Sequence, residues 1–549
     1  MNISILAINS KYVHSSLALW YLTAACKDCG VVTPLEHSIN EPRGKILQSV
    51  CESNPDVLAV CTYIWNIDMV LCLCKELKLV LPEVKIILGG PEASFRGKEL
   101  MGSHPEIDGI VLGEGENALP SYLNGTIPNG FIYRHNNEIV QNGSYQCICD
   151  LNELPSPYTP EMLSSLKGKL AYFESSRGCP FSCSYCLSSA TLGVRYFSVE
   201  RVKDDILKLV SSGVETIKFV DRTFNANTAF ATEIVSFLLT LDTKTTFHFE
   251  VGADLFKDEL LNLLLSAPEG KFQIEAGIQS TNPETLKSVC RTTDTQYALS
   301  VLKKISARKN IHVHADLICG LPHEDLSSFK NSFNDLFAAR PHTLQVGFLK
   351  LLHGSKLRDT FNGKFSPFAP YQVLESDKLS AQDLFFLQNF ENAVELFYNS
   401  GRFSCTINYL ASCLPSPFDL FALLSEKTGS HSAYSPDSLF ELMASFCKSS
   451  DKVDISRAQA ALSFDYLCSF KARFLPTFLA EPENSFHLIE QGKLPEFSSL
   501  PIKELLKSVA IKTFPYDMQC DNLPLSSCTY VISRRNRSPV DGRFVIKKL

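Results

Sequence analysis

Strand-like and helical patterns alternate along the first 150 residues of the chain. The runs NISILAINS, DVLAVCTYIW, VKIILGG and IDGIVLGEGE read as strands, and each ends in small or polar residues. Helical patterns lie between them, over KYVHSSLALWYLTAAC and NIDMVLCLCKELKLVLP. Such alternation is typical of a parallel sheet with helices on both faces. We therefore expect an open, doubly wound α/β domain over residues 1–150, with its ligand site at the carboxyl ends of the strands.

A second series of strands and helices follows from about residue 165. Helical patterns separate its six apolar runs, and the helices over residues 199–213 and 283–291 carry the clearest signals, with Asn282 as a cap and Pro283 in the first turn. The runs are KLAYFESS, VETIKFVD, TTFHFEV, KFQIEAGIQ, NIHVHADLI and HTLQVGFLKLL. Six such units predict a partial (β/α)6 barrel over residues 165–360, whose active site lies at the carboxyl ends of its strands.

The pattern changes again after residue 360. A phenylalanine-rich helix is predicted over residues 379–403, and further helices over residues 417–427, 436–449 and 456–473. Two short strand-like runs, SCTYVIS and GRFVIKKL, end the chain. We expect a mainly α-helical domain over residues 361–549 that shapes a substrate pocket or serves as an accessory domain, because no catalytic motif occurs in it.

The composition is that of an ordinary globular protein. Hydrophobic residues make up 45% and charged residues 20% of the 549 residues. No run approaches the roughly 18 apolar residues of a membrane span, and the amino terminus lacks the basic region of a signal peptide. We therefore expect a cytoplasmic protein with no membrane partner.

The charge balance does not indicate a nucleic-acid partner. The net charge is −7, from 52 basic and 59 acidic residues, whereas nucleic-acid-binding domains are typically basic. The tail SRRNRSPVDGRFVIKKL is the local exception, with six basic residues against Asp541. It is either a solvated terminus or an arm that binds a polyanion.

Cysteines supply the most specific signal in the chain. Most of the nineteen, such as Cys61 and Cys319, lie in apolar or helical contexts and are expected to be core residues. The run SSRGCPFSCSYCLSS instead gathers Cys179, Cys183 and Cys186 as C-x3-C-x2-C. A zinc site normally has four ligands, and Cys147 and Cys149 are the only obvious reserve. Three thiolates suit a four-iron cluster with one open iron; a zinc knuckle or a trio of redox thiols is the alternative.

The stretch RGCPFSCSYC resembles the cluster-binding loop of the radical S-adenosylmethionine (SAM) superfamily. This resemblance implies that Cys179, Cys183 and Cys186 hold a [4Fe-4S] cluster and that Tyr185 lies near the adenine of SAM. It also implies that SAM binds the open iron through its amino and carboxylate groups. An electron from the cluster then cleaves SAM to give a 5′-deoxyadenosyl radical.

The same resemblance suggests further residues that bind SAM. The segment FVDRTFN stands where the superfamily has a Gly-Gly-Glu segment, so Asp221 either contacts SAM or caps the next helix. Glu275 and Gln279 alternate with apolar residues and share one strand face; buried polar groups there need partners, which favours a ligand. His312 and His314 alternate in the same way on the fifth strand, and Gln345, Gly347 and Lys350 of the sixth are candidates to face a substrate. The predicted SAM-binding residues are Tyr185, Asp221, Glu250, Glu275, Gln279 and Gly320.

The loops of the first domain resemble those of the cobalamin (B12)-dependent class of radical SAM enzymes, whose first domain is Rossmann-like. GGPE and GEGE match its two glycine-containing loops, and the resemblance covers about residues 1–360. His14 lies in the first loop, but the D-x-H-x-x-G signature of a cobalt-ligating histidine is missing, so His14 either ligates cobalt or lines the pocket. The predicted cobalamin-binding residues are His14, Tyr63, Trp65, Gly89, Gly90, Pro91, Glu92, Gly113, Glu114, Gly115 and Glu116.

The resemblance implies an enzyme with three cofactors: a [4Fe-4S] cluster, SAM, and cobalamin as methylcobalamin or hydroxocobalamin. Methyl transfer to an unactivated carbon or phosphorus centre is the expected reaction, and ring formation or rearrangement is the alternative within the class. A methylthiotransferase and a non-catalytic corrinoid or iron–sulfur carrier are further alternatives. The expected partners are a small-molecule or peptide substrate and an electron donor such as flavodoxin or ferredoxin. The carboxy-terminal domain resembles an uncharacterised extension found on some of these enzymes.

Overall fold

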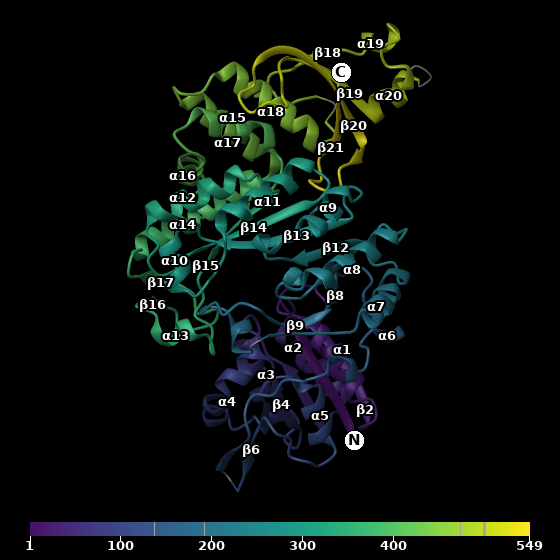
Figure 1. The fold of residues 1–549 in the computed structure, drawn as a ribbon, viewed down its shortest axis with the longest axis vertical. Coiled ribbons are helices and arrows are strands. Elements are labelled where there is room, and N and C mark those ends of the chain that lie inside the picture. The colour runs from purple at the N-terminus through teal and green to yellow at the C-terminus, as the bar shows by residue number, and fades with distance from the viewer. Residues whose placement is uncertain (137, 192, 432, 473, 498–500) are drawn as a thin grey trace. The chain divides into compact units, whose positions relative to one another are not determined.

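The chain folds into two compact units (Figure 1). The computed structural model describes residues 1–549 apart from 137, 192, 432, 473 and 498–500. The first unit comprises Met1–Leu263, Lys287–Thr292 and Leu349–Leu374, and the second comprises Leu264–Leu286, Thr293–Phe348 and Glu375–Leu549.

A seven-stranded sheet forms the amino-terminal part of the first unit. Its order is β2-β1-β3-β4-β5-β6-β7, in which β1 to β5 are parallel and β6 and β7 are antiparallel additions. The strands are β1 (Asn2–Asn9), β2 (Val31–Ser38), β3 (Val57–Cys61), β4 (Lys85–Gly89), β5 (Gly109–Val111), β6 (Phe131–His135) and β7 (Glu138–Asn142), and the helices are α1 (Leu17–Ala25), α2 (Arg43–Ser53), α3 (Ile67–Val80), α4 (Pro91–Ser103) and α5 (Gly115–Leu123). The predicted doubly wound domain is therefore confirmed. The strand order reverses between β1 and β3, and a ligand is expected at such a switch point.

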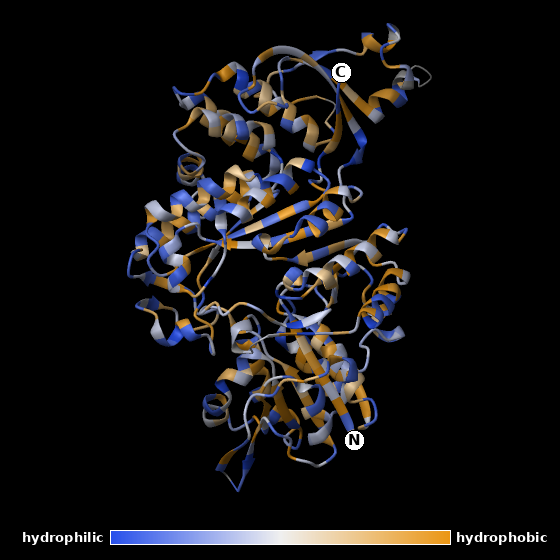
Figure 2. Ribbon diagram, viewed as in Figure 1, coloured by the Kyte–Doolittle hydropathy of each residue, from blue (hydrophilic) through white to orange (hydrophobic). Residues whose placement is uncertain are grey.

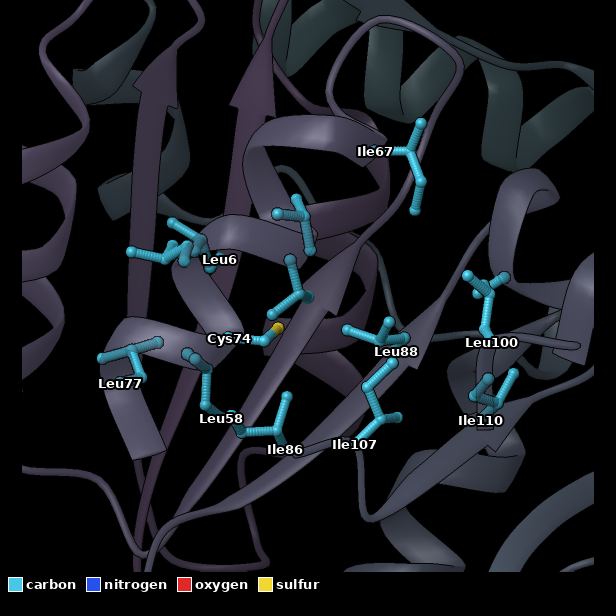
Figure 3. Packing of buried hydrophobic residues seen from close by; sticks show 14 of the residues in the cluster. Leu6, Leu58, Ile67, Cys74, Leu77, Ile86, Leu88, Leu100, Ile107 and Ile110 are labelled. Carbon is cyan, nitrogen blue, oxygen red and sulfur yellow. The ribbon is translucent and has the colours of Figure 1, made fainter. Parts of the chain in front are cut away.

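Burial of apolar side chains explains why these segments form a sheet. The central strands are largely hydrophobic in Figure 2, and every residue of β3 is buried. Leu58, Ile86 and Leu88 pack with Cys74 and Leu77 in one core cluster, which Figure 3 shows. Burying one such aliphatic side chain contributes roughly 1.5–3 kcal/mol, so this core fixes the strands whose carboxyl ends carry the predicted loops.

The sequence prediction differs from the structure of this domain in several places, and the strands β6 and β7 were not predicted. The strand β2 was not predicted, because VVTPLEHS is only partly buried and contains a proline. The first helix begins at Leu17 rather than Lys11, because Ser16 is its amino-terminal cap and its hydroxyl accepts a hydrogen bond from the Leu19 amide. Residues 11–16 are consequently free to form a loop at the carboxyl end of β1.

The six strands predicted for the barrel are all present, three in each unit. In the first unit β8 (Ala171–Phe173) pairs in parallel with β11 (Thr216–Phe219), which pairs with β12 (Thr246–Glu250). In the second unit β13 (Phe272–Gln279), β14 (His312–Cys319) and β15 (Thr343–Phe348) form a parallel set. The helices that accompany these strands are α6 (Pro160–Ser165), α7 (Val199–Ser211), α8 (Thr228–Thr240), α9 (Asp258–Ser266), α10 (Pro283–Ser288), α11 (Thr295–Arg308) and α12 (Leu326–Ala338).

Side-chain caps explain where several of these helices begin. Ser198, Asn227, Asp294 and Asp325 each accept a backbone N–H in the first turn of the helix that follows. A cap of this kind stabilises a helix by about 1 kcal/mol. The caps therefore end the loops that follow the strands at defined positions.

The carboxy-terminal part of the second unit is mainly helical, as predicted. It adds a four-stranded antiparallel sheet of order β18-β19-β20-β21. The short elements α13 (Lys356–Thr360) and β16 (Gly363–Phe365) belong to the first unit, and β17 (Val373–Ser376) spans the boundary between the two units. The second unit then continues with α14 (Ala381–Val394), α15 (Ser404–Cys413), α16 (Pro417–Thr428), α17 (Pro436–Ser449), α18 (Ile455–Ser469), β18 (Glu483–Asn484), α19 (His487–Glu490), α20 (Ile502–Ser508), β19 (Val509–Tyr516), β20 (Leu525–Arg537) and β21 (Phe544–Lys548).

The basic tail is an integral part of this sheet. Arg543 forms an ion pair of 2.7 Å with the fully buried Asp465, and Arg534 donates to the carbonyls of Leu506 and Ala472. Lys548 forms an ion pair with Asp517. These three basic residues of the tail are therefore paired with other parts of the second unit.

A search of the described residues found no single helix that is long and apolar enough to cross a membrane. The bent pair Ser404–Cys413 and Pro417–Thr428 passes the same test of length and composition when its two helices are combined.

Candidate functional site

A cavity of about 560 Å³ opens at the carboxyl ends of the parallel strands in the first unit. Its walls come from the loop after β1, from β3, β4 and β5 with the loops that follow them, and from helix α1. Tyr172 of β8 and two residues that follow it, Glu174 and Arg177, also line it. The cavity lies at the switch point of the sheet, where the topology predicts a ligand.

The glycine-containing loops line this cavity at defined places. Gly89, Gly90, Pro91, Gly113 and Gly115 are among its lining residues. Gly90 has a φ of 99°, and a side chain there would approach the Thr62 carbonyl to 2.5 Å. Gly113 has a φ of 98°, and a side chain there would come still closer to the Gln146 carbonyl. Only glycine adopts this backbone without strain, so the loops present main chain rather than side chains to a ligand.

Two aromatic residues form a flat wall of the cavity. The rings of Tyr63 and Trp65 are stacked, with centroids 4.5 Å apart and planes 5° apart. Trp65 donates its indole N–H to the Ile8 carbonyl at 3.0 Å, and the buried Asn66 donates to the same carbonyl. The Asn66 side chain also accepts from the Tyr63 amide at 2.8 Å. Asn66, which the sequence analysis did not select, thus holds the loop that carries the aromatic wall.

His14 lies on the loop after β1 and lines the cavity. Its Nδ1 is 2.6 Å from the Tyr172 hydroxyl, and the two rings are stacked. Burial lowers the pKa of His14, and the nearby Lys11 and Lys218 lower it further. The imidazole is therefore neutral at pH 7.

The two carboxylates of the GEGE loop form ion pairs with arginines. Arg177 Nη2 lies 2.6 Å from Glu116 Oε1 and 2.7 Å from Glu174 Oε1, and Arg195 Nη2 lies 2.6 Å from Glu114 Oε1. Burial raises the pKa of Glu114, but the hydrogen bond from Arg195 and the charge of Arg177 outweigh burial, so the net pKa is below its usual range. Glu114 and Glu116 line the cavity, and each is already paired with an arginine.

Glu92 occupies a different place from the rest of its loop. It is 4% exposed, accepts a hydrogen bond of 2.8 Å from the Tyr371 hydroxyl and lies 3.6 Å from Arg96. It is not among the residues that line the cavity. Its position suits a structural tie between α4 and the segment around residue 371 better than a ligand contact.

The two arginines belong to a hairpin that carries the cysteine loop. The strands β9 (Ser176–Cys179) and β10 (Gly193–Tyr196) are antiparallel, with Arg177 opposite Arg195 and Cys179 opposite Gly193. Cys179 ends β9, and its sulfur lies 3.6 Å from the Thr223 hydroxyl. The loop that holds Cys183 and Cys186 therefore starts two residues after an arginine of the cavity wall.

Neighbouring segments brace the cysteine loop through its main chain. The Ser184 amide donates to the Val289 carbonyl at 2.9 Å, and the Ser184 carbonyl accepts from the Leu357 amide at 2.8 Å. Cys183 is 4% exposed, whereas Cys179 and Cys186 are partly exposed. The loop thus presents three sulfurs on a main chain that is held in place.

The sulfurs of Cys179, Cys183 and Cys186 do not all lie within 4.8 Å of one another. Cysteine thiolates are the ligands that normally hold an iron–sulfur cluster, whereas a structural zinc site takes four ligands. Cys147 and Cys149 are exposed and do not join such a group.

Arg291 also reaches the cysteine loop. Its Nη1 lies 3.8 Å from Cys183 Sγ and 3.5 Å from the Tyr185 hydroxyl. The predicted helix over residues 283–291 ends at Ser288, which leaves Arg291 in the loop that follows. No motif marks this arginine in the sequence, since it meets Cys183 only through the fold.

Asp221 and Glu250 are predicted SAM ligands in the first unit. Asp221 is 1% exposed and accepts from the amide and hydroxyl of Ser175 and from the hydroxyl of Ser176. Burial raises its pKa to about 6, although these hydrogen bonds oppose the shift. Asp221 therefore fixes the start of β9. Glu250, at the end of β12, lies 3.7 Å from the Lys218 ammonium.

Glu275, Gln279 and Gly320 belong to the second unit. Glu275 groups with His314 and Asp316, since ligand atoms of the three lie within 4.8 Å of one another. Gln279 ends β13 with a φ of 71°, and its Oε1 has no hydrogen-bond partner among the described residues. Gly320 begins a loop that is tied down by the fully buried Glu324, which accepts from Ser280 at 2.6 Å.

Three family models match the chain. Residues 3–123 match the B12 binding domain, residues 173–336 match the Radical SAM superfamily, and residues 359–532 match a protein family of unknown function (DUF4080). The resemblance drawn from the cysteine loop and the glycine-containing loops is thereby confirmed. The predicted domain boundaries stay a prediction.

Two curated relatives are methyltransferases. The cobalamin-dependent radical SAM methyltransferase TokK of Streptomyces tokunonensis is 28% identical over 338 residues, which are 55% of this chain and 48% of TokK. The 2-(S-pantetheinyl)-carbapenam-3-carboxylate methyltransferase of Streptantibioticus cattleyicolor is 27% identical over 325 residues, 53% of this chain and 46% of that protein. The chain thus spans about half the length of these relatives.

A solved structure shares the fold over most of the chain. The cobalamin-dependent SAM radical enzyme OxsB, with aqua-cobalamin and SAM bound, matches with a TM-score of 0.61 and 14% identity. The match covers 91% of this chain and 81% of OxsB. The predicted fold class is confirmed by this likeness.

Proposed function

We propose that this chain, which joins a B12 binding domain to a radical SAM domain, is a cobalamin-dependent radical SAM methyltransferase that acts on a small molecule. Its two curated methyltransferase relatives support this reaction class. The methyl acceptor would be an unactivated carbon or phosphorus centre, and a small electron-transfer protein such as flavodoxin or ferredoxin would supply electrons.

One observation carries the proposal: the cavity of the first unit shares a wall with the hairpin that holds the cysteine loop. Arg177 lines the cavity and is two residues from Cys179 on the same strand. An enzyme that uses cobalamin together with a radical SAM cluster needs its two cofactor sites next to each other. This unit provides that arrangement within one body.

The residues of the cavity suit a corrin. The ring system of cobalamin is broad and largely apolar, with amide groups at its rim. The stacked pair of Tyr63 and Trp65 offers a flat apolar surface, and the main chain of Gly89, Gly90 and Gly113 offers donors and acceptors to amides. Cys179, Cys183 and Cys186 would hold the [4Fe-4S] cluster. When bound, the cluster supplies the electron that cleaves SAM, and cobalamin carries the methyl group.

His14 lines the pocket in this proposal and does not ligate cobalt. Its Nδ1 shares a hydrogen bond of 2.6 Å with the Tyr172 hydroxyl, and the D-x-H-x-x-G signature of a cobalt-ligating histidine is missing around it. The pair of His14 and Tyr172 would therefore shape the cavity wall. In the second unit, the unpartnered Oε1 of Gln279 supports a role in binding SAM.

The test is anaerobic reconstitution with iron, sulfide and hydroxocobalamin. Iron and cobalt per chain are measured first. The protein is then incubated with SAM and a strong reductant, and 5′-deoxyadenosine and S-adenosylhomocysteine are quantified. Cys183→Ala should lose the cluster and both products, whereas Cys72→Ala, at an exposed helical cysteine, should behave as the wild type.

The outcomes separate the parts of the proposal. Iron and cobalt together with 5′-deoxyadenosine support it, and candidate methyl acceptors would then be screened with labelled SAM. Iron and 5′-deoxyadenosine without retained cobalt would contradict the methyltransferase and leave a radical enzyme of another kind. Absence of a reducible cluster in the wild type would contradict the whole proposal.

A further inference from the structure

The short segment of residues 287–292 packs against the cysteine loop of the first unit. The Val289 carbonyl accepts a hydrogen bond from Ser184, between two of the cysteines. Two residues later, Arg291 Nη1 approaches Cys183 Sγ at 3.8 Å and the Tyr185 hydroxyl at 3.5 Å. The first of these contacts is long, as the large radius of sulfur allows. This segment therefore brings a cation to the most buried of the three cysteines.

The backbone of this segment turns sharply between its two contacts. Val289 is fully buried, and Cys290 is exposed with a φ of 56°, a left-handed conformation that is uncommon outside glycine and asparagine. A non-glycine residue keeps such a conformation only where its surroundings impose it. Here the turn places Val289 in the core and directs Arg291 onto the cysteine loop.

The chemistry of the guanidinium defines what Arg291 can do there. Arginine stays protonated at all physiological pH values, so the group brings a permanent positive charge. Its Nη1 donates to Cys183 Sγ, and this sulfur is expected to bind iron. Hydrogen bonds to cluster sulfurs and nearby charge set the reduction potential of an iron–sulfur centre. Reduction makes the cluster more negative, and a cation beside it stabilises the reduced form.

We propose that Arg291 is a positioning residue that raises the reduction potential of the cluster held by Cys179, Cys183 and Cys186. This inference rests on the proposed function, because it requires a redox-active cluster in the loop. By making the cluster easier to reduce, Arg291 increases the fraction of enzyme that is able to cleave SAM at the potential of its electron donor.

The experiment is a redox titration of the reconstituted full-length protein, monitored by the EPR signal of the reduced cluster in the absence of SAM. Arg291→Gln removes the charge and keeps a side chain that donates hydrogen bonds. Arg291→Lys keeps the charge and loses the planar fork of donors. Lys287→Gln is the matched control, because it removes the same charge from an exposed position four residues away. Iron content is measured for each variant.

We expect a midpoint potential in Arg291→Gln that is more negative than in the wild type, an intermediate value in Arg291→Lys and an unchanged value in Lys287→Gln. At a fixed intermediate potential, Arg291→Gln should form less 5′-deoxyadenosine, and a stronger reductant should restore the yield. If Arg291→Gln does not retain its cluster, the inference is tested by the midpoint potential of Arg291→Lys, which should be more negative than that of the wild type.

Two results would overturn the inference while leaving the proposed function intact. One is a midpoint potential of the cluster that is the same in the wild type, in Arg291→Gln and in Arg291→Lys. The other is an unchanged potential without SAM combined with weaker SAM binding, which would make Arg291 a ligand of the SAM carboxylate. A wild-type protein that holds no reducible cluster would overturn the inference and the proposed function together.

Discussion

Arg177 is the residue whose removal should perturb the first unit most clearly. Its guanidinium forms ion pairs with Glu116 and Glu174 at 2.6 and 2.7 Å and lies 3.5 Å from Glu114. The four side chains are only 9–16% exposed. In Arg177→Gln the carboxylates remain in place without their shared cation, and only Glu114 keeps a second arginine.

The expected loss follows from the burial of this network. Removing one partner of a buried ion pair costs about 3–5 kcal/mol, because the other charge stays buried without compensation. The lower end of that range is appropriate because the carboxylates keep slight solvent contact. A loss of about 3 kcal/mol corresponds to a decrease in melting temperature of about 5 °C in a unit of roughly 300 residues.

The stability loss of Arg177→Gln should depend on pH. Burial raises the pKa of Glu114, but Arg195 and Arg177 bring it below its usual range. A carboxyl with a lowered folded-state pKa contributes stability above its ordinary pKa of about 4.3 and loses it as the pH falls further. The deficit of Arg177→Gln should therefore be full at pH 7 and smaller near pH 4.

Thermal melts of the protein without added cofactors, at both pH values, are the assay. Arg43→Gln is the control, because Arg43 forms a solvent-exposed pair with Glu76 and exposed pairs contribute little. The reasoning would be refuted if Arg177→Gln had the same melting temperature as the wild type at pH 7. It would also be refuted if the difference in melting temperature were larger at pH 4 than at pH 7.

Three further predictions concern the cavity and the second unit. Tyr63→Ala and Trp65→Ala should each lower the cobalt retained per chain after gel filtration, and unchanged cobalt would exclude the aromatic wall as a corrin contact. The EPR spectrum of bound Co(II) cobalamin should show no nitrogen coupling from a protein histidine, and it should be the same in His14→Ala; coupling that disappears in this variant would make His14 a cobalt ligand. His342 accepts a hydrogen bond from the Val313 amide, and burial lowers its pKa to about 4. Because the folded state resists protonation of this histidine, stability should fall by about 2 kcal/mol between pH 7.5 and pH 5. In thermal melts, His342→Asn should lose less stability between pH 7.5 and pH 5 than the wild type does. An equal loss in both proteins would contradict this prediction.

The sequence was sufficient for those features that depend on local pattern. Strands such as β3 and β13 are marked by their apolar residues, and the cysteine spacing is a short motif. The ion-pair partners of the GEGE glutamates could not be predicted from the sequence, because Arg177 and Glu116 are 61 residues apart in the chain. The same holds for Tyr371, which is 279 residues from Glu92, and for Arg291. Charged side chains in a loop look available in a sequence, and only the fold shows that another segment already neutralises them.

The ion pairs between the GEGE loop and the cysteine hairpin limit how the chain can be divided. Glu114 and Glu116 lie within the B12 binding domain, whereas Arg177 and Arg195 belong to the next one. A fragment cut near residue 150 would expose both carboxylates and lack the part of the cavity wall that Tyr172 and Arg177 supply. We therefore expect that the amino-terminal domain cannot be separated from the hairpin without losing these ion pairs. A chimera that exchanges it between related proteins should carry the hairpin of residues 176–196 with it, so that both halves of the network come from the same parent.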